Sequence, residues 1–405
     1  MTGVSTLSSA LTRISLINDQ NELLNSLTTQ LATGRKTQQF SGLDTSILAS
    51  KRARADLGTL ETYTNNIKIG DRRISQMLLA IEEFQEQAAN LSNGLTQLSQ
   101  ESTHQEGNII VSDDPFTTTI ENTQIGHSSG EPDVDLETLQ DLAGNLFAFM
   151  GDLLNTQDGE RYVLGGADAL TQPYTDNGIL DAAISTQIGI WKDELTPPVD
   201  PTLTKTEELI SALRSRTVAQ DPSAMTDSIV GYSAALSAGN VGDVFVRADE
   251  KIEIEYTALA NEQPFRDIMV AAAFIKSETL GPIADVYNEP YTFGDMPVEN
   301  GAPGATLQDQ KENFYQVLND LTAMVNQAID GLDSIRFRLE NARVRIDEIQ
   351  QAHTTDKNLL ENTIDSVENV DINQVAIEIN LLQVQLEASY RVTSSVSQLS
   401  LVNFL

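Results

Sequence analysis

Apolar side chains recur in steps of three and four over long stretches of this chain, and this pattern predicts long helices. The most regular run lies in the C-terminal third, where apolar positions alternate these two steps without a miss. Such a repeat is the heptad pattern of a coiled coil, so this helix needs a partner along its length. The positions are Phe314, Leu318, Leu321, Val325, Ala328, Leu332, Ile335, Leu339, Ala342, Ile346 and Ile349.

Two further stretches carry matching apolar stripes. In the N-terminal third an apolar residue returns every seven positions, and most alternate positions between these residues are also filled, with Asp71 as the break. A third stripe runs between residues 136 and 153. Three such helices on one chain can bury their stripes against each other as an antiparallel bundle. The two sets are Leu60, Ile67, Ile74, Ile81, Ala88 and Leu95, and Leu136, Leu139, Leu142, Leu146, Met150 and Leu153.

Both chain ends repeat the theme. The first helix is predicted to end at Thr33–Gly34, because glycine commonly terminates a helix. The last helix carries two apolar stripes, and the N-terminal helix is able to cover only one of them. We therefore expect an assembly interface at these residues: Leu7, Ile14, Ile17, Leu24, Leu31, Ile379, Leu382, Leu386, Val392, Leu399, Val402 and Leu405.

The middle of the chain is rich in Gly, Pro, Asp and Thr, and short strand-like runs appear there. Predicted strands are Thr117–Ile120, Tyr162–Leu164, Ile188–Trp191 and Ile252–Tyr256, and Phe265–Ile275 reads as a helix. The fold class that follows is mainly α, a long antiparallel coiled-coil rod formed by both chain ends, with an inserted, acidic, β-containing α+β domain.

This pattern predicts a division into three domains. The terminal helices, 1–40 and 366–405, form one; a helical rod comprises 41–105, 136–165 and 305–365; and 166–304 is the inserted outer domain. Residues 106–135 are expected to form a loop or hairpin that leaves the rod.

Charge is distributed unevenly. Residues 101–300 hold 9 basic and 35 acidic side chains, which is −26 of the total net charge of −34. Phosphate would be repelled by such a surface, so nucleic acid is not an expected partner. The first thirty residues lack the apolar block of a cleaved signal peptide, and no window approaches the length of a membrane span. We expect no membrane partner and, if the protein leaves the cell, export without a cleaved leader.

Candidate chemistry is sparse, and no catalytic, cofactor or metal site is expected. Cysteine is absent, and His104, His127 and His353 lie in no recognisable nucleophile or zinc motif, so histidines on a helix surface or in a loop are the favoured interpretation. The alternating acids of 131–137 lack the glycine of a calcium loop and favour a solvated run that caps the helix at 136. The basic cluster Lys51, Arg52 and Arg54 favours ion pairing with acidic helices at a subunit contact over nucleic-acid binding.

Particular segments resemble the bacterial flagellin family. The stretch 30–36, Gln-Leu-Ala-Thr-Gly-Arg-Lys, is similar to the family's segment after the first helix. The stretch 366–371, Ser-Val-Glu-Asn-Val-Asp, is similar to its Ser-Ile-Glu-Asp-x-Asp motif, with Asn369 in place of the usual acid. Within the family, Asn155–Gly166 with Pro173-Tyr174, and the ending 397–405, resemble the hook–filament junction proteins more than the filament subunits. The resemblance covers about 1–105, 136–175 and 310–405.

The resemblance implies a structural, extracellular component of the bacterial flagellum, exported through the flagellar type III apparatus with an export chaperone. It implies a homo-oligomeric ring around the flagellar axis that joins the first hook–filament junction protein to flagellin. Two alternatives stay open: a filament flagellin, which is a bulk polymer, and a free-standing coiled-coil binding protein. Since terminal helices without neighbours leave apolar surface exposed, we expect about 1–40 and 366–405 to be disordered in dilute monomer and to fold on assembly.

Overall fold

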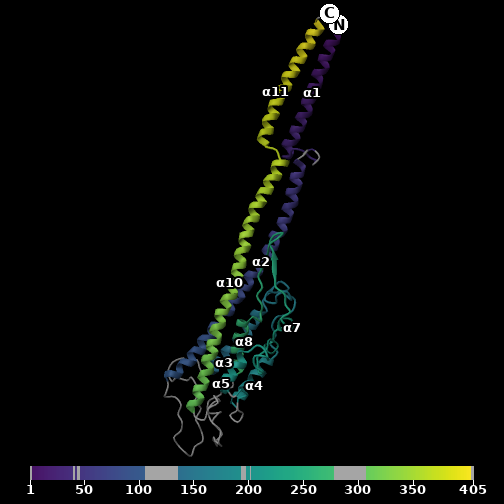
Figure 1. Cartoon of the computed structure of the whole chain (residues 1–405). Coiled ribbons are helices and arrows are strands. Elements are labelled where there is room, and N and C mark those ends of the chain that lie inside the picture. Colours follow the sequence, from purple (N-terminus) through teal and green to yellow (C-terminus); the bar gives the residue numbers. More distant parts are fainter. Residues whose placement is uncertain are drawn as a thin grey trace, which may run out of the picture. The chain divides into compact units, whose positions relative to one another are not determined.

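The computed structural model describes residues 2–39, 42, 46–104, 136–192, 198–200, 202–277 and 307–402. The described chain is mostly helical with a few very short strands, which confirms the predicted fold class (Figure 1). Its contacts divide it into two compact units. The first unit comprises Met1–Asn65 and Glu348–Leu405, and the second comprises Asn66–Asp347. The predicted strand at 117–120 lies outside the described residues.

The first unit holds the two terminal helices, α1 (Thr2–Thr33) and α11 (Ile372–Val402). They lie side by side and antiparallel, with both chain termini at the same end of the pair (Figure 1). As predicted, α1 ends at Thr33, and Gly34 follows with a φ of 71°, a conformation that glycine adopts without steric cost.

The second unit is organised around the helices α2 (Ile47–His104) and α10 (Leu307–Glu368), whose outer turns also extend into the first unit. Most of the predicted seam positions are buried in both helices, among them Ile67, Ile74, Leu332 and Leu339. Leu60 and Ile349 are half-buried, and the side chain of Phe314 lies outside the described residues. The helices run antiparallel, as three cross-helix contacts show: Asp71 with Arg343 at 2.9 Å, Gln85 with Asp333 at 3.1 Å, and Ser92 with Asn326 at 2.7 Å.

The predicted third helix is α3 (Leu136–Leu154), and its stripe faces the same core. Leu139, Leu146 and Met150 are buried, whereas Leu142 is half-buried. At Gly94 of α2 an added Cβ would lie 2.7 Å from the Leu139 side chain, so the absence of a side chain there lets the two helices approach closely.

At the centre of this unit lies α8 (Gln263–Ser277), which contains the predicted helix 265–275. A helix that is apolar on all sides belongs inside a protein, and nearly all residues between 265 and 275 are buried. The Phe265 ring meets the Phe84 ring of α2 edge-on at 5.1 Å. Pro264 packs against Gly331 of α10.

Arg266 of α8 is fully buried and holds a neighbouring loop in place through hydrogen bonds to its backbone. Its guanidinium donates to the backbone carbonyls of Leu213, Arg214, Ser215 and Met225, and it pairs with Asp267 at 2.7 Å. The carbonyls lie at and beyond the end of α5 (Lys205–Arg214) and before the short helices α6 (Asp227–Val230) and α7 (Ala234–Ser237). Arg266 therefore satisfies backbone groups that burial would otherwise leave without partners.

The strands form two small antiparallel hairpins. One pairs β1 (Gln157–Asp158) with β2 (Arg161–Tyr162), and the other pairs β3 (Phe245–Arg247) with β4 (Glu253–Glu255). The predicted strand 252–256 is confirmed at its centre, with buried Ile254 between exposed Glu253 and Glu255. Of the predicted strand 162–164, only Tyr162 lies in a strand.

The predicted strand at Ile188–Trp191 is wrong, because these residues lie in α4 (Ile179–Lys192). Leu180, Ile184, Ile188 and Trp191 are all buried and follow one another at steps of four, four and three. That spacing puts them on one helix face, which packs toward α8.

Candidate assembly interface

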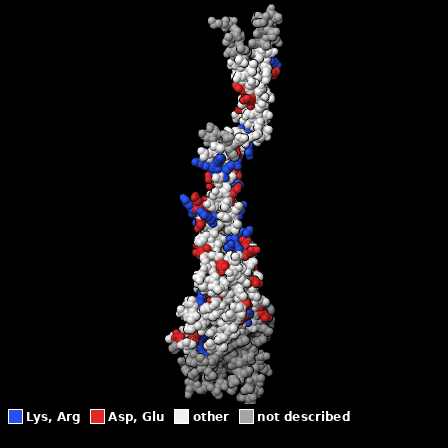
Figure 2. Space-filling model, turned by 90° about the vertical axis from the view of Figure 1, so that its right-hand side faces the viewer, with Lys and Arg blue, Asp and Glu red and all other residues white. Residues whose placement is uncertain are grey.

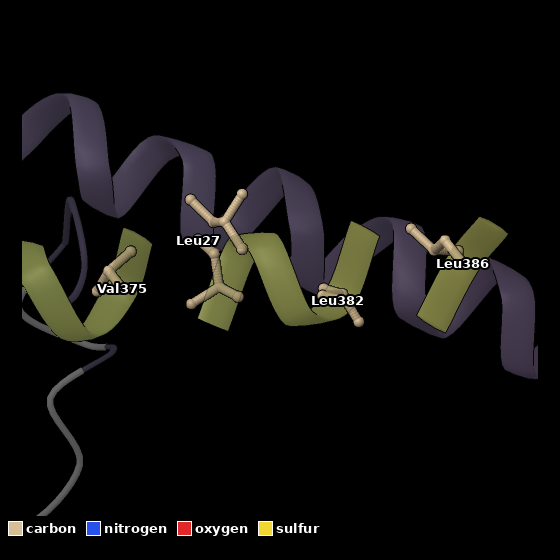
Figure 3. Packing of buried hydrophobic residues seen from close by; sticks show 5 residues of the cluster. Leu27, Val375, Leu382 and Leu386 are labelled. Carbon is tan, nitrogen blue, oxygen red and sulfur yellow. The ribbon is translucent and has the colours of Figure 1, made fainter. Parts of the chain in front are cut away.

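The α1–α11 pair has a small apolar seam of its own. Leu27 of α1 packs with four residues of α11, and Ile17, Leu24 and Val370 are partly buried against this cluster (Figure 3). The buried residues of α11 follow the first of its two apolar stripes at steps of four and three, and they are Val375, Ile379, Leu382 and Leu386.

The second apolar stripe of α11 is uncovered. Ile377, Leu381, Val384 and Val392 are between 55% and 68% exposed, and they share a face that α1 does not touch. On α1, Leu11, Leu16 and Leu23 are also exposed. Solvent-exposed apolar side chains that continue along one helix face are typical of a surface that another molecule covers.

A third face of α11 is polar, and it separates the two apolar ones. Asn380, Gln383, Glu387 and Arg391 lie there, and Glu387 pairs with Arg391 at 2.6 Å. Figure 2 shows few charged side chains along the described part of this helix pair on the face in view. The helix thus has one face toward α1, one toward water, and one apolar face without a neighbour in the described residues.

The residues expected at an assembly interface therefore occupy different environments. Ile379, Leu382 and Leu386 are buried against α1, and Ile17 and Leu24 are partly buried. Exposed positions are Ile14, Leu31 and Val392. Leu7, Leu399 and Val402 lie in the terminal helices but their side chains are outside the described set, as is the whole of Leu405.

The segment that follows α1 is joined by backbone hydrogen bonds to the segment that precedes α11. The backbone N–H of Lys36 donates to the carbonyl of Glu368 at 2.8 Å, and the N–H of Val370 donates to the carbonyl of Gly34 at 3.0 Å. Arg35 and Asn369 form the bridge between these bonds. The segments 34–36 and 366–371, which resemble flagellin in sequence, thus pair with each other.

Glu368 is the electrostatic centre of this clasp. The side chain is almost fully buried, and its two oxygens accept hydrogen bonds from Arg54 at 2.9 and 2.7 Å. Ser50 donates a further, short hydrogen bond. The Arg54 guanidinium and the Ser50 hydroxyl favour the ionised carboxylate, and they lower the pKa of Glu368 to about 2.

The clasp corrects one prediction from the sequence. The basic cluster 51–54 was expected to pair with acidic helices of another subunit, but Arg54 pairs with Glu368 of its own chain. Lys51 and Arg52 are exposed. No local signal joins Arg54 to Glu368, since they are 314 residues apart in sequence. The sequence feature that includes Glu368 is the flagellin-like motif 366–371, and this motif does not indicate which residue pairs with Glu368.

Of the three histidines, the structure describes the side chain of His353. His353 is buried in a helix rather than exposed on its surface, and neither of its ring nitrogens has a hydrogen-bond partner among the described residues. The side chains of His104 and His127 lie outside the described part, as do those of the acids at 131–137. Within that part, His, Asp and Glu side chains form no cluster that could hold a metal ion. None of the described helices is long and apolar enough to cross a membrane.

Comparison with known families identifies the C-terminal part of the chain. Residues 322–405 match the model of the bacterial flagellin C-terminal helical region, a stretch that includes most of α10, the motif around Glu368 and all of α11. A search of curated proteins gives no match. The C-terminal part of this chain is thus similar to that of bacterial flagellins, which supports the flagellin family and a structural role in the flagellum.

Proposed function

We propose that this protein is a structural subunit of the bacterial flagellum and acts as its hook–filament junction adaptor. In this proposal the chain is exported through the flagellar type III apparatus, helped by an export chaperone. Copies then form a ring that joins the first hook–filament junction protein to flagellin. The family match at 322–405 supports the flagellar assignment.

The observation that carries the proposal is the uncovered stripe of α11. Burying apolar area stabilises by about 25 cal/mol per Å², so each exposed side chain of this stripe is a source of binding free energy that the single chain leaves unused. Neighbouring copies and related subunits stacked around an axis would cover it. In this arrangement 1–40 and 366–405 line the tube, the helical rod surrounds them, and 166–304 lies outermost.

The adaptor role, as distinct from a filament subunit, is supported by the segment that follows α3. Asn155, at the start of this segment, and Tyr174, at its end, are joined by hydrogen bonds. The Asn155 side chain donates to the carbonyl of Tyr174 at 2.9 Å and accepts from its N–H at 3.1 Å. The segment that resembles the junction proteins is therefore one folded element.

Localisation along single flagella tests the adaptor role. A fluorescent label on this protein should mark one spot between hook and filament. A label along the whole filament would instead establish the second candidate, the filament flagellin. The uncovered stripe of α11 is compatible with both roles, so the position of the label is what separates them. Absence of the label from flagella would reject both and favour a free-standing coiled-coil protein.

A pair of adjacent substitutions tests the interface itself. Leu381→Asp places a charge on the uncovered apolar stripe, whereas Asn380→Asp adds the same charge on the neighbouring polar face. Burying an unpaired carboxylate costs several kcal/mol, so the Leu381 variant should shed unpolymerised flagellin into the medium. The Asn380 variant should swim normally. Equal swimming by both variants would argue against the interface.

A further inference from the structure

The helices α2 and α10 also carry apolar side chains on faces turned away from their common seam. On α10, Phe337 and Val344 are 66% and 55% exposed. They are seven residues apart and therefore share one face. Each stands two residues before a buried seam residue, Leu339 and Ile346 respectively, which is the heptad position farthest from the partner helix.

The equivalent face of α2 has the same feature. Leu79 is 66% exposed and stands two residues before buried Ile81, so it occupies the same outer heptad position as Phe337. Ile69, also exposed, lies on the outer side three turns earlier, beyond the buried seam residues Ile67 and Ile74. The helix pair thus has an apolar patch on each of two opposite sides, and all these residues belong to the second unit.

These two patches lie at the same height along the helix pair. The contacts Asp71–Arg343 and Gln85–Asp333 fix how the antiparallel helices are aligned. By that alignment Ile69 is level with Val344, and Leu79 is level with Phe337. A patch on one side of a subunit that matches a patch at equal height on the other side suits copies set side by side around an axis.

At the level of Ile69 and Val344 the charges beside the two patches are opposite in sign, whereas Leu79 is followed by the acids Glu82 and Glu83. Val344 is flanked on the outer face of α10 by exposed Glu340, which lies 3.7 Å from Arg336 of the same helix, and by exposed Asp347. Ile69 is flanked on α2 by exposed Lys68 and Arg72; Arg72 pairs with Asp158 of the same chain at 3.0 Å, so Lys68 is the charge on which the contact depends. An isologous contact would place the acids of α10 against the same acids of a second copy, which is unfavourable. A contact between the α10 face of one copy and the α2 face of the next would place Asp347 opposite Lys68.

We infer that a second copy of this chain occupies these faces, with α10 of one copy on α2 of the next in a head-to-tail contact. This inference rests on the proposed function, since it names the side-to-side contact that would join copies within the ring. It is separate from the α11 stripe, which lies in the other unit.

Because the natural chain has no cysteine, introduced thiols report the contact without background. Three variants are needed: Ile69→Cys, Val344→Cys and the double variant. Flagella are isolated from cells that express each variant as the sole copy and treated with a flexible bis-maleimide. The two thiols of one chain lie on opposite sides of the helix pair, so a link between them joins separate copies.

The double variant should give a ladder of dimers, trimers and larger species on a denaturing gel, whereas each single variant should stay monomeric. An equal mixture of the single variants should give dimers and no ladder. If the protein is present in flagella but the double variant gives no ladder, or if Val344→Cys alone gives dimers, the inference is wrong and the proposed function stands. If the protein is absent from flagella, the proposed function itself falls and the inference with it.

Charge reversal supplies the second measurement. Lys68→Glu or Asp347→Lys alone should reduce the amount of this protein in flagella several-fold, and the double reversal should restore it. Retention at the natural level in both single variants would count against the contact.

Discussion

The carboxylate of Glu368 and the guanidinium of Arg54 form a two-pronged ion pair that joins the end of α10 to the start of α2. Glu368→Gln keeps the size of the side chain but removes its charge. Hydrogen bonds to charged groups contribute about 1.5–3 kcal/mol, so this variant should lower the stability of the assembled protein by that amount. Denaturant-induced disassembly, followed by circular dichroism, measures the difference.

The effect of this substitution should depend on pH. The folded-state pKa of Glu368, about 2, lies below its ordinary value of 4.5. The ion pair therefore stabilises the folded state fully above about pH 4.5, and its contribution is lost as the pH falls toward 2. The stability difference between natural protein and Glu368→Gln should shrink over that window. A difference that stays constant from pH 7 to pH 2 would show that Glu368 is not the titrating group.

Replacing Arg266 should strongly destabilise the second unit. Arg266→Ala would leave the buried carbonyls of Leu213, Ser215 and Met225 without their donor, and each such loss costs about 1–3 kcal/mol. We expect a loss of more than 3 kcal/mol in urea unfolding. Arg247, exposed and bonded to one carbonyl, is the control, and Arg247→Ala should cost less than 1 kcal/mol. Similar losses in both variants would contradict this role.

The long helices could be predicted because their signal is repeated many times. A single apolar residue does not indicate a helix. From Leu318 to Ile346, however, each buried seam residue follows the previous one by three or four positions, so the helical period is repeated along the whole seam. Even the break at Asp71 has a structural meaning, since Arg343 of the facing helix pairs with it. Sequence reasoning also identified the two stripes of α11, because each follows the helix period separately.

Short elements and long-range polar contacts could not be predicted in the same way. The run Ile188–Trp191 contains two β-branched isoleucines and a tryptophan, so by itself it suits a strand, and the helical spacing back to Leu180 was needed to assign it. The Arg54–Glu368 pair and the bonds of Arg266 to loop carbonyls depend on which segments meet in space. The periodic pattern of apolar residues contains no information about these long-range polar contacts.

Gly331 and Gly189 should respond in opposite directions to the same substitution. A Cβ at Gly331 would lie 2.5 Å from the ring of Pro264, which cannot move aside easily, so Gly331→Ala should destabilise by about 1–3 kcal/mol. Nothing lies within 4 Å of a Cβ at Gly189, in α4, so there alanine should stabilise by about 0.5–1 kcal/mol through its helix propensity. Urea unfolding measures both, and equal signs would contradict the packing argument.

His353 continues the α10 seam seven residues beyond Ile346, and its imidazole faces Tyr63 at 6.4 Å between ring centroids. A buried polar group without a hydrogen bond lowers stability. His353→Leu should therefore stabilise the helices by about 1 kcal/mol in thermal unfolding, whereas His353→Gln, still polar, should bring no gain. A less stable leucine variant would mean that the imidazole has a favourable role.

The terminal helices should be ordered only in the assembled protein. Among the side chains described in α1 and α11, Leu27 and four residues of α11 are the buried apolar ones, and helices of about thirty residues gain most of their stability from packing. With the second stripe of α11 in water, the pair lacks the burial that this stripe would provide if it were covered. In dilute monomer the amides of 1–40 and 366–405 should exchange hydrogen within seconds, and proteases should trim these ends first. In isolated flagella the same amides should be protected. Slow exchange at Leu382 in the monomer would show that contact with α1 alone holds the helix, and the uncovered stripe would then no longer explain why copies assemble.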